Sequence, residues 1–116
     1  MSHNQRIGTW GEQAAADYLT AHGYEILDRN VRTPYGEIDL LARKEGFTIF
    51  VEVKARTSGS FGPPEISVSR PKLTHMIACA EHFAQHNGID HWQIDVIAVL
   101  KVRGEARITH FENAAS

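Results

Sequence analysis

The chain has one cysteine and no long apolar run. Cys79 by itself cannot form an internal disulfide, so the fold does not depend on oxidation. No apolar stretch approaches the ~20 residues that a membrane-spanning helix needs, and the polar residues 1–6 are not followed by an apolar signal-peptide region. We therefore expect a cytoplasmic protein that does not partner a membrane.

Several common catalytic motifs are also missing. The sequence has no phosphate-binding loop, no glycine-rich dinucleotide turn and no serine nucleophile motif. A length of 116 residues suits a single domain, which we assign to residues 1–116. Any catalytic chemistry must therefore come from side chains scattered over one small core.

The charge is modest overall but uneven along the chain. The net charge is −2, which argues against a broadly basic nucleic-acid binder. Between Arg29 and Lys72, however, eight basic residues outnumber five acidic ones. A local cationic surface suits a phosphate backbone, although a solvated surface with uneven charge has the same composition.

The hydrophobic pattern predicts an α/β fold. We expect helices over residues 7–22 and from about 69 to 87, the second with Ser69 as its N-cap. We expect strands over residues 25–31, 37–43, 47–55 and 91–100, a short one over 106–111, and an irregular loop over 56–67. The order αβββαβ(β) predicts a central mixed β-sheet flanked by two helices.

Two of the predicted strands carry charged residues where apolar ones are expected. Alternate side chains of a strand share a face, so Glu37 and Asp39 share one, as do Glu52 and Lys54. If the strands pair, Asp39, Glu52 and Lys54 converge. Two carboxylates can hold a hard divalent cation such as Mg²⁺, and an ammonium group can orient the attacking water. This combination is typical of phosphodiester hydrolysis.

Structural explanations exist for the same residues. Asp39 and Lys54 could form a cross-strand ion pair, and Glu52 and Lys54 could be neighbours on a solvated face. Glu12 lies at the margin of the buried arc of the first helix, so it could reach the sheet or point to water. Glu37 could be an outer-shell acid or bond to the preceding turn. We interpret Asp95, in the fourth strand, as structural.

A histidine stripe on the second helix offers another possibility. His82 and His86 are four residues apart and could bind zinc, which would predict stoichiometric zinc in the purified protein. The pair has no evident third ligand, so we interpret the stripe as a polar helix face and Cys79 as a buried apolar residue.

Blocks of residues over nearly the whole chain resemble a known family, the YraN-like uncharacterised bacterial proteins. The two blocks that carry most of the resemblance are specific when they occur together at this separation. The matching residues are Gly11-Glu12, Tyr18-Leu19, residues 23–27, Arg29-Asn30, residues 36–40, residues 50–54, Arg56, Phe61-Gly62, Pro64 and Lys72.

The resemblance implies a single-domain restriction-endonuclease-like fold, similar to archaeal Holliday-junction resolvases. That superfamily uses an Asp and then a Glu-x-Lys on consecutive strands, often with a Glu on the first helix. The corresponding residues of this chain are Asp39, Glu52, Lys54 and Glu12. Fold alone does not fix activity.

We therefore expect a Mg²⁺- or Mn²⁺-dependent endonuclease acting on DNA, with branched (Holliday-junction-like) DNA or recombination and repair intermediates as candidate substrates. Asp39 and Glu52 would bind the metal ion, and a homodimer would suit the cleavage of two strands. The alternative is a non-catalytic module that binds nucleic acid or protein. The loop over residues 58–64 would close over the nucleic acid, and the expected phosphate contacts are Arg29, Asn30, Arg32, Arg56 and Lys72.

Overall fold

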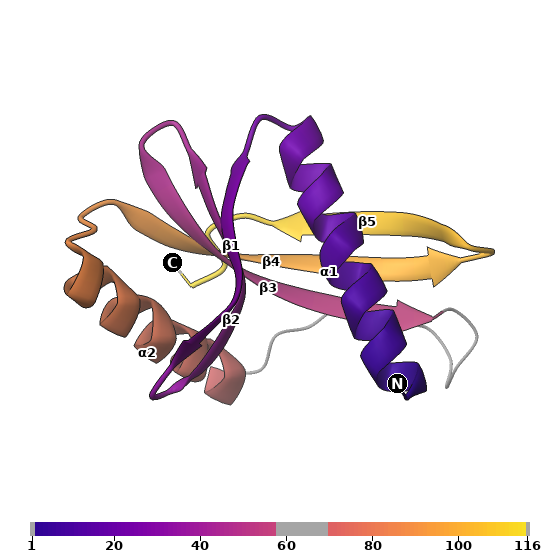
Figure 1. Cartoon of the computed structure of the whole chain (residues 1–116), viewed down its shortest axis with the longest axis horizontal. Coiled ribbons are helices and arrows are strands. Elements are labelled where there is room, and N and C mark those ends of the chain that lie inside the picture. Colours follow the sequence, from indigo (N-terminus) through magenta and orange to yellow (C-terminus); the bar gives the residue numbers. More distant parts are fainter. Residues whose placement is uncertain (1, 58–69, 116) are drawn as a thin grey trace.

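The computed structural model describes residues 2–57 and 70–115, and its element order is the predicted one (Figure 1). The described elements are the helices α1 (His3–Ala21) and α2 (Arg70–Asn87) and the strands β1 (Glu25–Thr33), β2 (Gly36–Lys44), β3 (Phe47–Thr57), β4 (Trp92–Val102) and β5 (Glu105–Phe111). The prediction of an α/β fold with two helices, a three-stranded meander and two further strands is confirmed.

The five strands form one mixed sheet in the order β1-β2-β3-β4-β5. β1, β2 and β3 pair antiparallel as consecutive hairpins, β3 and β4 pair parallel, and β4 and β5 pair antiparallel. A parallel pair needs a crossover connection, and the connection between β3 and β4 contains α2. In the strand order, this parallel pair has β1 and β2 on one side and β5 on the other.

The two helices cover opposite faces of the sheet. Ile49 and Val51 of β3 pack toward α1, whereas Phe50 between them packs toward α2, as strand alternation requires. In Figure 1, α1 crosses the strands and α2 lies apart from it. Both faces of the central strands are thus buried.

No helix in the described part of the chain is long and apolar enough to span a membrane.

Helix α1 begins earlier than the sequence pattern predicted. It starts at His3 instead of about residue 7 because Ser2 and Gln5 form a capping box. The Ser2 hydroxyl accepts from the Gln5 backbone N–H at 3.2 Å, and the Gln5 side chain accepts from the Ser2 backbone N–H at 2.8 Å. The prediction followed the apolar stripe, which begins at Ile7, and missed this polar cap.

Strand β1 is also less regular than predicted. Strict alternation would place Ile26, Asp28 and Asn30 on one side, but the pairing register with β2 shifts between Ile26 and Asp28. A bulge of this kind breaks the alternation and bends the strand. Farther along β1, Asn30 has a positive φ of 52°, a conformation that asparagine tolerates better than most residues.

Strand β3 is longer than predicted. It continues through Thr57, because Arg56 and Thr57 pair with Leu100 and Lys101 of β4, so these two residues do not belong to the loop. The remainder of the predicted loop and the predicted cap Ser69 lie outside the described residues.

Helix α1 and strand β3 approach each other closely at Gly11 and Ala55. A Cβ built on Gly11 would clash with the Cβ of Ala55, whereas one on Gly8 would meet nothing within 4 Å. We predict that Gly11→Ala destabilises the fold by about 1–3 kcal/mol because the helix must move away from β3.

Gly8→Ala is the matched control in the same helix. It should stabilise the protein by up to about 1 kcal/mol through helix propensity alone. Urea unfolding of both variants measures the two effects, and equal stabilisation by both would contradict the close contact.

Candidate functional site

Strands β2 and β3 stop pairing at the residues that the sequence singled out. Their ladder runs from Lys44–Phe47 to Leu40–Val51 and ends there. One more step would place Asp39 opposite Glu52. Instead, the Asp39 Oδ2 accepts a hydrogen bond at 2.8 Å from the backbone N–H of Val53. A side chain of β2 thus occupies the backbone donor of β3 at the point where the strands separate.

Asp39 and Glu52 lie close together at this point, with little solvent around them. Glu52 is only 9 % exposed and Asp39 is half-buried. Burial, and then the neighbouring charge of Glu52, raise the pKa of Asp39 to about 7, against the lowering effect of the hydrogen bond from Val53. The two carboxylates repel each other when both are charged, and a bound cation would relieve this repulsion.

Helix α2 supplies a cation to this site. The Lys72 Nζ lies 2.8 Å from Glu52 Oε1, with the Lys72 side chain 48 % exposed and that of Glu52 11 %. The hydrogen bond with Glu52 raises the pKa of Lys72. The structure therefore brings Lys72, which the sequence analysis placed among the phosphate contacts, onto a predicted metal ligand.

Glu12 and Glu37 approach the site from α1 and β2, and Asn30 joins them. With its amide oriented to satisfy both acids, the Asn30 side-chain nitrogen donates to Glu12 Oε1 at 2.9 Å and to Glu37 Oε1 at 3.0 Å. Asn30 lies between Arg29 and Val31, whose partners in β2 flank Asp39. The expected phosphate contact Asn30 is thus a bridge between two carboxylates.

The charge around Glu12 is also concentrated. Burial and the charge of Glu37 raise the pKa of Glu12, Arg29 opposes the shift, and Glu52 adds to it. These influences mean that Glu12 lies near enough to Glu37 and Glu52 to belong to the same electrostatic cluster. The prediction that Glu12 could reach the sheet agrees with this arrangement.

The remaining predicted residues surround this cluster. Arg29 donates to the Gln13 side chain at 2.7 Å and is exposed. Arg32 forms a 3.9 Å ion pair with Glu37, both side chains well exposed. Lys54 is half-buried two residues after Glu52, on the same side of β3 by alternation, and Arg56 is exposed farther along. Arg29 and Arg32 thus border the acidic centre, whereas Lys54 and Arg56 follow Glu52 along β3.

The structure separates the other candidates from this site. Asp95 lies in another hydrogen-bond network, with Gln93, His110 and the backbone of Asn113. The rings of His82 and His86 stack 4.0 Å apart, and among the described residues no third ligand completes a metal-binding group with them. Cys79 is buried, as expected.

Sequence reasoning missed one group of residues. The Asp95 network includes His110, which also contacts Tyr18, and Glu112 lies beside it. Neither His110 nor Glu112 was predicted as a site residue. The available signal was the alternation of His110 and Glu112 at the end of the last strand, which directs both to one face.

The fold and the acidic cluster define an α/β protein with charged residues gathered at a strand separation. The chain belongs to the family described as "uncharacterised protein family UPF0102", which matches residues 11–99. The matched range includes Glu12, Asp39, Glu52 and Lys54 and ends before β5. The resemblance noted from the sequence is therefore confirmed.

Relatives cover nearly the whole chain. A UPF0102 protein of Syntrophotalea carbinolica is 43% identical over 93% of this chain and 89% of its own length. A second, of Syntrophomonas wolfei, is 39% identical over 96% of this chain and 98% of its own. A third, of Flavobacterium psychrophilum, is 36% identical over 98% and 97%. The alignment with these three relatives thus covers most of this chain and most of each relative.

The raised pKa of Asp39 predicts a pH-dependent stability. Because the fold favours the neutral form of the Asp39 carboxyl, the folded protein keeps this stabilisation in full below the unfolded pKa of 3.8. The stabilisation is lost as the pH rises through the folded pKa of about 7. Asp39→Asn removes the charge and keeps an oxygen for Val53. In the presence of a chelator, its stability advantage over the wild type should grow by about 1–3 kcal/mol between pH 5 and pH 8.

Urea unfolding at the two pH values measures this difference. Asp17→Asn, at an exposed acid of α1, controls for the removal of one negative charge. An advantage of Asp39→Asn that stays constant with pH would show that Asp39 is not frustrated by its surroundings.

Proposed function

We propose that this protein is a metal-dependent nuclease that acts on DNA. The observation that carries the proposal is the meeting of Asp39 and Glu52 where β2 leaves β3, at a site where burial and mutual repulsion raise the pKa of Asp39 to about 7. Such a pair stabilises a divalent cation by its charge and by its oxygen donors. The restriction-endonuclease-like order of elements that the resemblance implies supports the same proposal.

The donor set suits Mg²⁺ or Mn²⁺. Both ions prefer oxygen ligands, and Asp39 and Glu52 supply carboxylates while Glu12 and Glu37 add negative charge nearby. Asp39 and Glu52 would hold the ion directly. The chemistry that the ion supplies when bound is Lewis-acid stabilisation of charge on the phosphate.

The basic side chains take the remaining roles. Lys54 follows Glu52 on the same side of β3, from which it would orient the attacking water and offset charge on the phosphate. Arg29, Arg32 and Arg56 would contact neighbouring phosphates, because guanidinium groups match phosphate oxygens. Asn30 would hold Glu12 in place through the 2.9 Å hydrogen bond.

Lys72 would change partners during the reaction. In the metal-free protein its ammonium group offsets the charge of Glu52 at 2.8 Å. A divalent cation on Glu52 would repel it, and its 48 % exposed side chain is long enough to turn toward solvent and a DNA phosphate. The ion pair would thus stabilise the site until the metal ion and the substrate replace it.

A second candidate is a non-catalytic module that binds nucleic acid or protein on the same scaffold. The net charge of −2 favours a protein partner over nucleic acid for this module, because phosphate-backbone binding usually rests on a strong positive surface. This candidate predicts that the protein binds a partner without cutting DNA under any divalent-ion condition.

Cleavage of labelled DNA separates the two candidates. With Mn²⁺, the wild type should cut at least one of a four-way junction, a flap and a linear duplex. Asp39→Ala should slow that cleavage by at least about 100-fold, the scale for losing one group that stabilises charge in the transition state.

Asp17→Ala is the matched control, because Asp17 is an exposed acid of α1 whose carboxylate accepts a hydrogen bond from the Gln13 side chain. It should retain the wild-type rate. Cleavage that Asp39→Ala leaves undiminished would remove the proposed site, and cleavage by neither protein would favour the binding module.

A further inference from the structure

A second group of possible metal ligands lies where the beginning of β4 meets the end of β5. Asp95, His110 and Glu112 each place one ligand atom within 4.8 Å of the other two. In the ladder, Val96 pairs with Phe111 and Ile97 with His110. One further step places Asp95 opposite Glu112, and His110 lies two residues before Glu112, so all three face the same side.

Outer partners hold each of these three side chains. The Asp95 Oδ1 accepts from the Gln93 side chain at 2.9 Å and from the Asn113 backbone N–H at 3.0 Å. The His110 Nδ1 lies 3.1 Å from the Tyr18 hydroxyl. Metal-binding histidines and carboxylates are typically fixed by such outer hydrogen bonds.

The inward atoms of the same side chains converge. The His110 Nε2 lies 2.7 Å from the Asp95 Oδ2, so one hydrogen sits between them. The Glu112 Oε1 accepts from the Tyr24 hydroxyl at 3.1 Å, which leaves its second oxygen available. The three residues thus offer two oxygens and one nitrogen to a common point.

The balance of charge at this point favours a cation. Asp95 is fully buried and the His110 side chain is 9% exposed. Among the described residues, no lysine or arginine forms an ion pair with Asp95 or Glu112. Burying the Asp95 carboxylate is costly unless it is paired, and its ion-pair partner here is the His110 imidazole.

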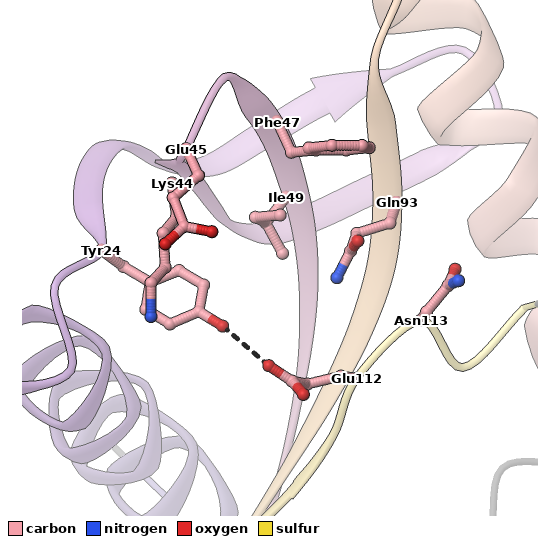
Figure 2. A pocket seen from close by; sticks show the side chains of 8 residues that line it. All are labelled: Tyr24, Lys44, Glu45, Phe47, Ile49, Gln93, Glu112 and Asn113. Atoms are coloured by element: carbon pink, nitrogen blue, oxygen red, sulfur yellow. Dashed lines mark hydrogen bonds between the residues drawn. The ribbon is translucent and has the colours of Figure 1, made fainter.

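A cavity gives access to the group. It has a volume of about 380 Å³, and Tyr24, Gln93, Glu112 and Asn113 contribute to its lining. Figure 2 shows the Tyr24 hydroxyl directed at Glu112, with the Gln93 and Asn113 side chains above and to the right of Glu112 in this view. The residues that hold Asp95 and Glu112 thus border a space large enough for an ion and water.

We propose that Asp95, His110 and Glu112 bind Zn²⁺. One imidazole nitrogen with two carboxylates suits Zn²⁺ better than Mg²⁺, which prefers oxygen ligands alone. The ion would take the Nε2 position, and the imidazole would keep one hydrogen on Nδ1, directed at the Tyr18 oxygen. A doubly protonated imidazole would release one proton, whereas a neutral one would move its hydrogen from Nε2 to Nδ1. Three protein ligands leave a fourth position for water from the cavity.

The zinc ion would fasten the end of the chain to the fold. Glu112 follows β5 directly, and Asn113 and Ala114 bond through their backbone N–H groups to Asp95 and Ile94 of β4. Tyr18 links the group to α1. This site is independent of the proposed nuclease site, since it shares none of its residues.

Glu112→Gln tests the site without disturbing the core, because Glu112 is exposed and glutamine keeps an oxygen for Tyr24. Calorimetry of the chelator-treated Asp39→Asn protein, in which the other proposed cation site has lost a ligand, should show one Zn²⁺ per chain. Glu112→Gln should weaken that binding by at least about tenfold, since even the loss of an outer partner weakens metal binding by that factor. Bound Co²⁺ should give the visible absorption of a site with a nitrogen ligand. Glu112→Gln should weaken Co²⁺ binding by the same factor as Zn²⁺ binding.

Two controls assign the binding. In the same Asp39→Asn background, Glu105→Gln, at an exposed acid at the start of β5, should bind Zn²⁺ as its parent does. Absence of Zn²⁺ binding by the Asp39→Asn protein, or equal binding when Glu112→Gln is added, would overturn the proposal. Loss of binding in His82→Ala would overturn it as well, because the ion would then occupy the stacked histidines of α2.

Discussion

The hydrogen bond from the Val53 backbone to the Asp39 carboxylate is the interaction on which the candidate site depends. It forms where β2 stops pairing with β3, and it provides the β3 N–H with an acceptor that a continued strand would have supplied. Without it, a buried backbone donor would lose its partner. The same contact fixes Asp39 beside Glu52, so the separation of the strands and the gathering of carboxylates have one cause.

The surrounding elements converge on this point for ordinary packing reasons. The small residues Gly11 and Ala55 let α1 lie close over β3, which brings Glu12 near the sheet. The left-handed conformation of Asn30 lets its side chain bridge Glu12 and Glu37 from β1. On the other face, α2 brings Lys72 to Glu52. Each element thus stabilises the fold and carries one charged group to the same place.

Much of this arrangement could be predicted from the sequence, because the relevant signals are local. Alternation in residues 37–43 and 47–55 gave the two strands, and the charges at Asp39, Glu52 and Lys54 stood out against apolar neighbours. The bulge in β1, the capping box at Ser2 and the roles of Asn30 and Lys72 depend on register and on contacts between distant segments. The Asp95–His110–Glu112 group escaped notice for the same reason, since its members meet only when β4 pairs with β5.

We propose that a divalent cation bound by Asp39 and Glu52 relieves the repulsion between these two carboxylates. Calorimetric titration of Mn²⁺ into a Glu112→Gln protein measures this directly, because that background removes the proposed zinc ligand Glu112. We predict one Mn²⁺ per chain, with binding abolished by Asp39→Asn. Lys72→Met should tighten binding by about two- to fivefold, the value of a partly exposed ion pair. Mn²⁺ binding that survives Asp39→Asn, or its absence at millimolar concentration, would contradict the account.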